Sequence, residues 1–262
     1  MKKTRNFLNN LYSLLFFLML IAIWEIISRT GSVPSYILPA PSMIIYSLFS
    51  NFSLMGRHIL VTVYETLVGF IISVFLGIII AIIMDGLPFV KKVIYPLLIT
   101  SQTIPIITLA PLFIIWFGYG YLPKIIIVIL ICFFPISINL LQGLGSVDIE
   151  LINLLKSMGA SKYQIYKIVK LPASLPSLFS GLKIAATYSI MGATIGEWVG
   201  GKDGIGVFML RAKYSFATDK VFGAIIIITV LSICLLKLIE FIERKSMPWV
   251  VYEKNDTLGE QI

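Results

Sequence analysis

Among the ionisable residues inside long apolar stretches of the sequence, three are the first candidates for chemistry. Glu65 and Glu197 carry carboxylates and Lys183 carries an amine, each surrounded mainly by uncharged residues. A charge at membrane depth costs free energy, so such residues often pair with one another or line the path of a polar solute. We predict Glu65 and Glu197 as solute-pathway residues. The structural alternative is that Glu65 caps a helix or pairs with Lys183 and so stabilises a helix bundle.

A second group of polar residues stands beside prolines in the segment 95–120. Gln102 and Thr103 come just before Pro105, and Pro111 follows. Proline inside a membrane helix frees backbone carbonyls, which is tolerated where the segment is packed against protein or lines a cavity. We predict that Gln102 and Thr103 face the pathway. The alternative is that their side chains hydrogen-bond neighbouring helices.

Aromatic residues supply a third kind of contact, because a planar solute can stack on their rings. Tyr188 and Trp198 complete the predicted pathway set. Tryptophan near a membrane surface is also typical of the interfacial belt, and this is the alternative we favour for Trp116 and Trp198.

The remaining motifs do not favour catalysis or metal binding. The glycine-rich segment 200–206 follows an expected membrane helix and not a strand, so we interpret it as a flexible outer loop and not as a phosphate loop. His58 is the only histidine and has no second histidine or cysteine ligand nearby. Cys132 and Cys234 lie in apolar runs, as small core residues do. Residue patterns typical of intramembrane enzymes are absent from the sequence, although a passive channel stays open as an alternative class.

The composition identifies the class of protein that must position these residues. Of 262 residues, 58% are hydrophobic and 13% are charged, and the mean hydropathy is +0.96, as in a polytopic membrane protein. Apolar blocks about long enough to cross a bilayer occur at 11–28, 59–84, 93–117, 121–141, 175–199 and 221–241. We therefore predict an all-α fold with six transmembrane helices. The first block resembles a signal peptide but lacks a convincing cleavage site, so we expect it to be retained.

The distribution of basic residues predicts the orientation. The net charge of +8 comes mainly from residues between the apolar blocks, which indicates topology and not nucleic-acid binding. More lysine and arginine residues fall on the inside if both termini are cytoplasmic. We thus expect a cytoplasmic N-terminus at 1–10, a transmembrane domain at 11–245 in which 148–172 is a cytoplasmic loop, and a cytoplasmic tail at 246–262 whose residues 252–262 are disordered.

The loop 148–172 has a helical pattern of its own. Its apolar residues recur at steps of three and four, which predicts two short helices. Gly159 permits the sharp turn between them, Ser161 is a plausible N-cap for the second helix, and Pro172 is expected to end it. Such a loop either binds a soluble partner or is an ordinary amphipathic surface helix.

The spacing within this loop carries a resemblance. Gly159, nine further residues and then Val169-Lys170-Leu171-Pro172 resemble the EAA loop of binding-protein-dependent ABC importer permeases. The Glu-Ala-Ala positions themselves hold Asn153, Leu154 and Leu155, so a role tied to that glutamate does not carry over. The stretches 38–42, 62–69 and 196–198, together with Pro105 and Ala110-Pro111, are similar to the nitrate, sulfonate, taurine and thiamine-precursor branch of the family.

This resemblance implies a type I ABC importer permease fold (MetI-like) and a division of labour between subunits. The sequence has no G-x-x-x-x-G-K-[ST] motif, so ATP and Mg²⁺ are expected on a separate ATPase and no cofactor on this chain. The implied partners are two copies of the ATPase, an extracytoplasmic solute-binding protein, a second copy of the chain and membrane lipid, with no nucleic acid. The implied ATPase-coupling residues are Leu154, Leu155, Met158, Gly159, Ala160, Tyr163, Leu171 and Pro172.

The resemblance also favours a substrate. The segments 180–186 and 196–198 look most like those of permeases for pyrimidine thiamine precursors or related heterocyclic vitamins. The acidic Glu197 fits a neutral or cationic heterocycle better than nitrate or a sulfonate, whose charge it would repel. Nitrate, sulfonate or taurine import is the alternative.

Overall fold

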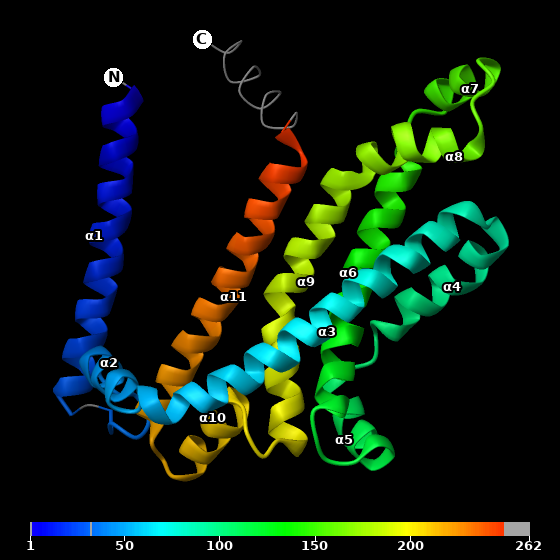
Figure 1. Cartoon of the computed structure of the whole chain (residues 1–262). Helices are drawn as coiled ribbons and strands as arrows, with labels where there is room; N and C mark the ends of the chain where they lie inside the picture. Colours follow the sequence, from blue (N-terminus) through cyan, green and yellow to red (C-terminus); the bar gives the residue numbers. More distant parts are fainter. Residues whose placement is uncertain (1, 32, 249–262) are drawn as a thin grey trace.

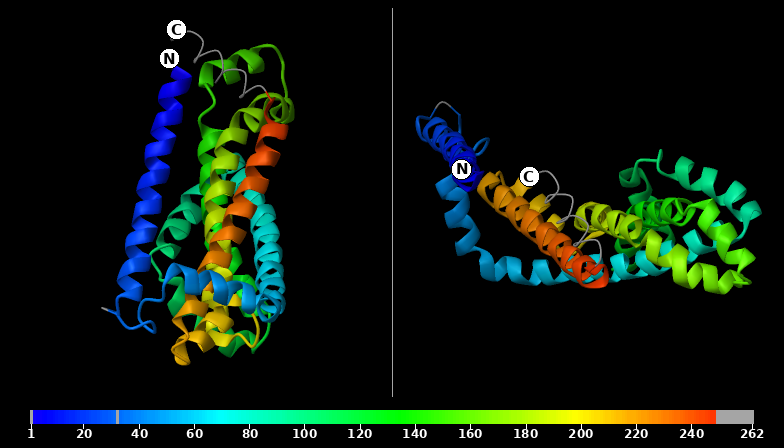
Figure 2. Two further views of the ribbon diagram at one scale, coloured as in Figure 1. Left: turned by 90° about the vertical axis from the view of Figure 1, so that its left-hand side faces the viewer. Right: turned by 90° about the horizontal axis from the view of Figure 1, so that it is seen from above.

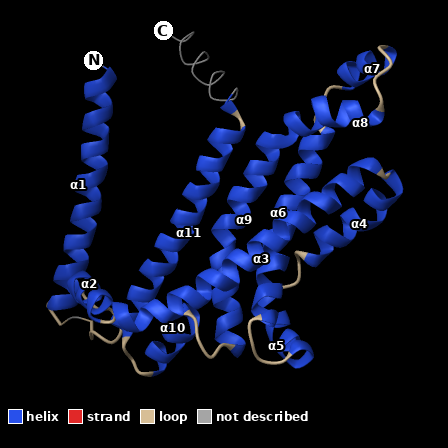
Figure 3. Cartoon of the chain, viewed as in Figure 1, coloured by secondary structure: helices blue, strands red, loops and turns tan. Residues whose placement is uncertain are grey.

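The computed structural model describes residues 2–31 and 33–248, and this part of the chain is helical without strands (Figure 3). The α-helices are α1 (Lys2–Arg29), α2 (Pro41–Ser50), α3 (Phe52–Gly86), α4 (Pro88–Ser101), α5 (Ile106–Phe117), α6 (Leu122–Gly145), α7 (Ile149–Ser157), α8 (Lys162–Ile165), α9 (Leu171–Gly200), α10 (Ile205–Tyr214) and α11 (Thr218–Ser246). A π-helix, η1 (Tyr166–Lys170), joins α8 to α9. The predicted all-α class is confirmed.

The membrane-spanning segments match the prediction except at the third. Among the described residues, α1, α3, α6, the continuous segment from α8 to α9, and α11 are each long and apolar enough to cross a membrane. The expected third span is not one straight helix, because the chain bends by 101° between α4 and α5. The break lies just before Pro105, which lacks a backbone N–H and disfavours helical geometry in the residue before it. The pair gives six spans if it is counted as one.

The two ends of the bundle carry different elements (Figure 1). The beginning of α1, the end of α11, and α7 and α8 lie at one end, which we call the loop end. Helices α2 and α10 and the end of α5 lie at the opposite end, which we call the far end. Seen from above, the arrangement is elongated, with α1 and α2 at one extreme and the α4 and α8 region at the other (Figure 2).

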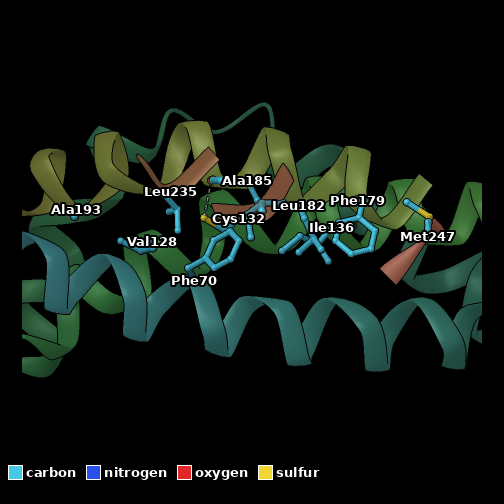
Figure 4. Close-up of a cluster of buried hydrophobic side chains, with 12 residues drawn as sticks. Phe70, Val128, Cys132, Ile136, Phe179, Leu182, Ala185, Ala193, Leu235 and Met247 are labelled. Carbon is cyan, nitrogen blue, oxygen red and sulfur yellow. Dashed lines mark hydrogen bonds between the residues drawn. The ribbon is translucent and has the colours of Figure 1, made fainter. Parts of the chain in front are cut away.

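The main core lies between four long helices and separates the two ends. Phe70 of α3, Ile136 of α6, Leu182 of α9 and Leu235 of α11 pack together there (Figure 4). Helices α6 and α9 approach closely at Gly181, which has no side chain. A Cβ atom there would lie only 2.6 Å from the Pro135 carbonyl oxygen. Such small-residue contacts are typical of helix pairs in membranes. The core therefore fixes the positions from which both ends project.

The loop 148–172 does not end at Pro172, which corrects the prediction. Pro172 lies in the first turn of α9, where a missing N–H is tolerated. The proline ring would crowd the carbonyl four residues earlier, and the chain widens into η1 at that point, with the Leu171 N–H bonded to the Tyr166 carbonyl five residues back. The second loop helix therefore runs on into the fifth membrane segment.

Candidate functional site

The loop 148–172 folds as a helix, a tight turn and a second helix. The Asp148 carboxylate accepts a hydrogen bond from the Glu150 N–H (2.8 Å) and begins α7. Gly159 has a φ of +84°, a conformation that favours glycine, and forms the turn. Ser161 is the N-cap of α8, and its partner Gln164 completes a capping box (Gln164 Oε1 to Ser161 N, 2.7 Å). The predicted turn and cap are confirmed.

Large apolar side chains of this loop face outward. Leu154, Met158 and Tyr163 are 58%, 75% and 71% exposed, because the loop projects from one end of the bundle (Figure 1). Leu155 and Ala160 are half-buried. Exposed apolar side chains at the tip of a helical hairpin are typical of a protein contact surface.

An ion pair anchors the base of this loop to α3. The Lys170 ammonium donates to both Asp85 carboxylate oxygens (2.6 and 2.9 Å), and the Tyr166 hydroxyl donates to Asp85 Oδ2 (2.7 Å). We call Asp85, Tyr166 and Lys170 the loop-end clamp. The paired carboxylate and ammonium side chains are 11% and 19% exposed, so the clamp stays in reach of water.

A second group of charges is buried at the far end. The Lys124 ammonium of α6 donates to Glu65 Oε1 of α3 at 2.6 Å, and their side chains are 5% and 0% exposed. Glu197 of α9 lies beside them and accepts a hydrogen bond from the Thr62 hydroxyl (2.6 Å). We call Thr62, Glu65, Lys124 and Glu197 the far-end cluster. It ties three long helices together, and charges this deeply buried persist only when they are paired.

The far-end cluster also holds the beginning of α10. The Gly206 N–H donates to Glu197 Oε2 (2.6 Å), and the Ile205 N–H donates to the Thr62 hydroxyl oxygen (2.8 Å). His58 accepts a hydrogen bond from the Gly204 N–H at Nδ1 (3.0 Å). These are the free N–H groups of a helix N-terminus, where a carboxylate is favourable. His58 thus has a structural hydrogen bond.

Gly204 is required by this arrangement. Its φ is +123°, and a Cβ atom there would lie 2.1 Å from the Glu197 Cδ atom. The end of the segment 200–206 is therefore hydrogen-bonded to His58, Thr62 and Glu197 where α10 begins, and the flexibility expected of this segment stays a prediction. No group of three or more potential metal ligands occurs among the described residues.

Comparison with known proteins identifies the family. Residues 73–247 match the family model described as "Binding-protein-dependent transport system inner membrane component". The chain belongs to this family. It is 39% identical to the formylaminopyrimidine transport permease ThiX of Halalkalibacterium halodurans over 90% of this chain and 94% of that one. It is 30% identical to the putative aliphatic sulfonates transport permease SsuC of Bacillus subtilis over 88% and 84%.

The fold of the permease agrees with this assignment. A chain of the MetNI methionine ABC transporter in an inward-facing conformation superposes with a TM-score of 0.57 at 19% identity, covering 79% of this chain and 98% of that chain. At this identity the likeness supports the fold alone. The predicted MetI-like architecture and the multi-pass membrane location are confirmed.

The structure places the predicted pathway residues in three different settings. Glu65 and Glu197 meet in the far-end cluster. Gln102 and Thr103 are exposed at the break between α4 and α5, where the Thr103 hydroxyl donates to the Thr100 carbonyl (2.7 Å). Tyr188 and Trp198 are exposed on α9. Trp198 lines a cavity of about 200 Å³ shared by α9, α10 and α11.

The alternative pairing of Glu65 with Lys183 is wrong. Lys124 takes that place because the first turn of α6 lies against α3 at the level of Glu65. The Lys183 ammonium instead pairs with Glu243 of α11 (2.9 Å), toward the loop end. Lys124 and Lys183 thus each form an ion pair with a glutamate of another helix.

Sequence reasoning missed Asp85 and Lys124 as partners. Asp85 directly follows the apolar block 59–84 on the predicted cytoplasmic side, and Lys170 lies on the same side in the loop 148–172. Matching charges by predicted depth would have paired them. Lys124 follows a proline at the beginning of a block, and its predicted depth equals that of Glu197. Depth was the available signal in both cases. The predicted disordered segment 252–262 lies outside the described residues.

Proposed function

We propose that this permease is the membrane subunit of an ATP-driven importer in which a separate ATPase binds the loop 148–172. The observation that carries the proposal is the helical hairpin that exposes Leu154, Met158 and Tyr163 at the loop end (Figure 1). A helix with exposed apolar residues fits a groove on a partner protein, and lysines around it can form the rim. Leu155, Gly159 and Ala160 shape that surface, and Leu171 and Pro172 join it to α9. ATP and Mg²⁺ bind to the ATPase in this proposal, and this chain binds no cofactor.

The proposed assembly contains two copies of this chain and two of the ATPase. Long apolar helices leave wide surfaces uncovered; the described side chains of α1, for example, are largely exposed. Lipid and the second copy cover them in this proposal. An extracytoplasmic solute-binding protein docks at the far end. Both termini are cytoplasmic, which is supported by the position of the beginning of α1 and the end of α11 at the loop end.

The proposed pathway runs past the α4 and α5 break and the exposed aromatic residues of α9. Gln102, Thr103, Tyr188 and Trp198 supply hydrogen-bonding and stacking groups there. Direct contact of Glu65 or Glu197 with solute stays a prediction and requires the far-end cluster to open, because both carboxylates are buried in it.

The proposed substrate is a formylaminopyrimidine or a related heterocyclic thiamine precursor. Its support is the 39% identity to a formylaminopyrimidine transport permease over 90% of the chain. The electrostatic argument from Glu197 no longer supports it, because that carboxylate accepts two hydrogen bonds and is 1% exposed. The 30% identity to a sulfonate transport permease favours an aliphatic sulfonate as the second candidate.

The coupling role is tested by Gly159→Pro in the co-expressed importer. Proline fixes φ near −65° and cannot adopt the +84° of this turn, and it removes the N–H that donates to the Lys156 carbonyl (2.9 Å). We expect normal membrane insertion, with the loss of ATPase co-purification or of ATP hydrolysis stimulated by the solute-binding protein. Gly159→Asn is the matched control, since asparagine tolerates positive φ. An unchanged stimulated hydrolysis in Gly159→Pro would refute the role of the loop.

The substrate is tested on the cognate solute-binding protein by calorimetry. Formylaminopyrimidine is expected to bind and an alkanesulfonate is expected not to bind. The reverse result would replace the pyrimidine proposal with the sulfonate one and would leave the coupling role intact.

A further inference from the structure

The loop-end clamp joins one carboxylate to two consecutive turns of the segment that leaves the loop. Tyr166 and Lys170 lie at the first and last positions of η1, and both donate to Asp85. The Lys170 ammonium also lies 5.3 Å from the centre of the Tyr166 ring, so the cation packs on the aromatic face. The three side chains form one compact unit.

Asp85 stands at the junction between α3 and α4. It is followed by Gly86, and Pro88 already belongs to α4. Near it, Met84 of α3 packs in an apolar cluster with Ile94 and Leu98 of α4, and the Tyr166 ring packs against the same cluster. The clamp is therefore linked to α4, the helix that leads to the α4 and α5 break, because the Tyr166 ring packs against the apolar cluster that α3 and α4 share.

The π-helix is the element in this chain of contacts that can change its winding. An isolated π turn holds one residue more than an α-helical turn and is often found at functional sites. The ring of Pro172 crowds the carbonyl four residues earlier, and its missing N–H removes one hydrogen bond. An α-helical winding is therefore not strongly favoured over the π turn here. A displacement of α7 and α8 reaches η1 first, and Asp85 is the polar group bound to both ends of η1.

We propose that Asp85 is a positioning residue that transmits displacement of the loop 148–172, through Tyr166 and Lys170, to α4 and the α4 and α5 break. This inference rests on the proposed importer function, in which a partner ATPase moves the loop. Without the carboxylate, Lys170 can turn to water, because it is already partly exposed. The bundle then keeps its core but loses the connection between η1 and the α3 to α4 junction.

The test measures movement at the break in the complete importer with its ATPase, reconstituted in lipid vesicles. Ile104 lies between α4 and α5 and is 43% exposed, so Ile104→Cys reports there once the exposed Cys234 is changed to serine. The probe is a charged maleimide, and its labelling rate is compared without nucleotide and after trapping with ATP and vanadate. We expect a nucleotide-dependent change in rate in this reference and its loss in Asp85→Ala.

The exchanged pair Asp85→Lys with Lys170→Asp is expected to restore the change, since the ion pair reforms with reversed polarity. The matched control is Glu243→Ala, which breaks the half-exposed Lys183 ion pair between α9 and α11 and is expected to keep the change. If Asp85→Ala does not assemble, the exchanged pair decides the matter.

The inference is overturned by a full change in Asp85→Ala, by no change in the reference, or by an exchanged pair that does not restore it. The proposed function is judged separately, by stimulation of ATP hydrolysis in the reference complex by the solute-binding protein. A reference that hydrolyses ATP under that stimulation but fails the labelling test removes the role of Asp85 and leaves the importer.

Discussion

The far-end cluster and the loop-end clamp use the same kind of ion pair in opposite ways. At the far end Glu65 and Lys124 are almost fully buried, and the neighbouring Glu197 is saturated by a hydroxyl and a helix N-terminus. At the loop end Asp85 and Lys170 keep access to water and bind to a π-helix. A fully buried pair is costly to separate, whereas a pair that keeps some access to water costs less to separate because its charges can be hydrated. We infer that the far end is held and that the loop end is built to move.

The largest expected effect comes from Lys124→Ala. The substitution leaves the Glu65 carboxylate buried without its cation, which in comparable cases costs about 3–5 kcal/mol. Unfolding of the purified permease by SDS in mixed micelles measures this loss. The double variant Lys124→Met with Glu65→Gln removes both charges and should recover much of it. A Lys124→Ala protein as stable as the parent would show that the far-end cluster does not hold the helices.

Gly204→Ala is expected to have the next largest effect. It adds a Cβ atom only 2.1 Å from the Glu197 Cδ atom at a residue with positive φ, so overpacking and backbone strain act together. Overpacking alone costs about 1–3 kcal/mol. The same SDS titration measures the change. The free-energy cost of Gly204→Ala should exceed that of a Gly→Ala substitution at an exposed glycine with positive φ. If it does not, Glu197 moves aside easily, which would contradict a far end that is held in place.

The sequence predicts the fold better than it predicts the partners within the fold. Helical spans follow from hydropathy and length, and Gly159 and Ser161 follow from local turn and cap chemistry, so these predictions succeed. The partners of Glu65 and Lys183 depend on which helices are neighbours, which no local pattern records. Proline gives a second example: the chain bends sharply next to Pro105, whereas it continues as a helix through Pro172 after one π-helical turn.

Gly159→Ala is the matched counterpart of Gly204→Ala and should cost less. Gly159 also has positive φ, but a Cβ atom there would meet nothing within 4 Å, so only the backbone strain of about 1–2 kcal/mol applies. The strain is local to the loop, and the SDS midpoint of the bundle should hardly change. Hydrogen exchange of the amides in 149–165 should increase instead. Equal losses of bundle stability in the two variants would contradict the separation of the two ends.

Asp85→Asn is expected to have the smallest effect on stability and is the sharpest test of the comparison. The amide keeps an oxygen that can accept from Tyr166 or Lys170 but removes the negative charge, and the freed ammonium can reach water. Because the freed ammonium can be hydrated, we expect a loss well below the about 3–5 kcal/mol of a fully buried pair that loses one partner, so the SDS midpoint should stay nearer to that of the parent. High salt should weaken the Asp85 and Lys170 pair more than the Glu65 and Lys124 pair, because the loop-end clamp keeps some access to water and the far-end cluster does not. If Asp85→Asn destabilised the bundle as much as Lys124→Ala does, the loop end would be as firmly held as the far end, and the ATPase would have to move the loop against the whole core.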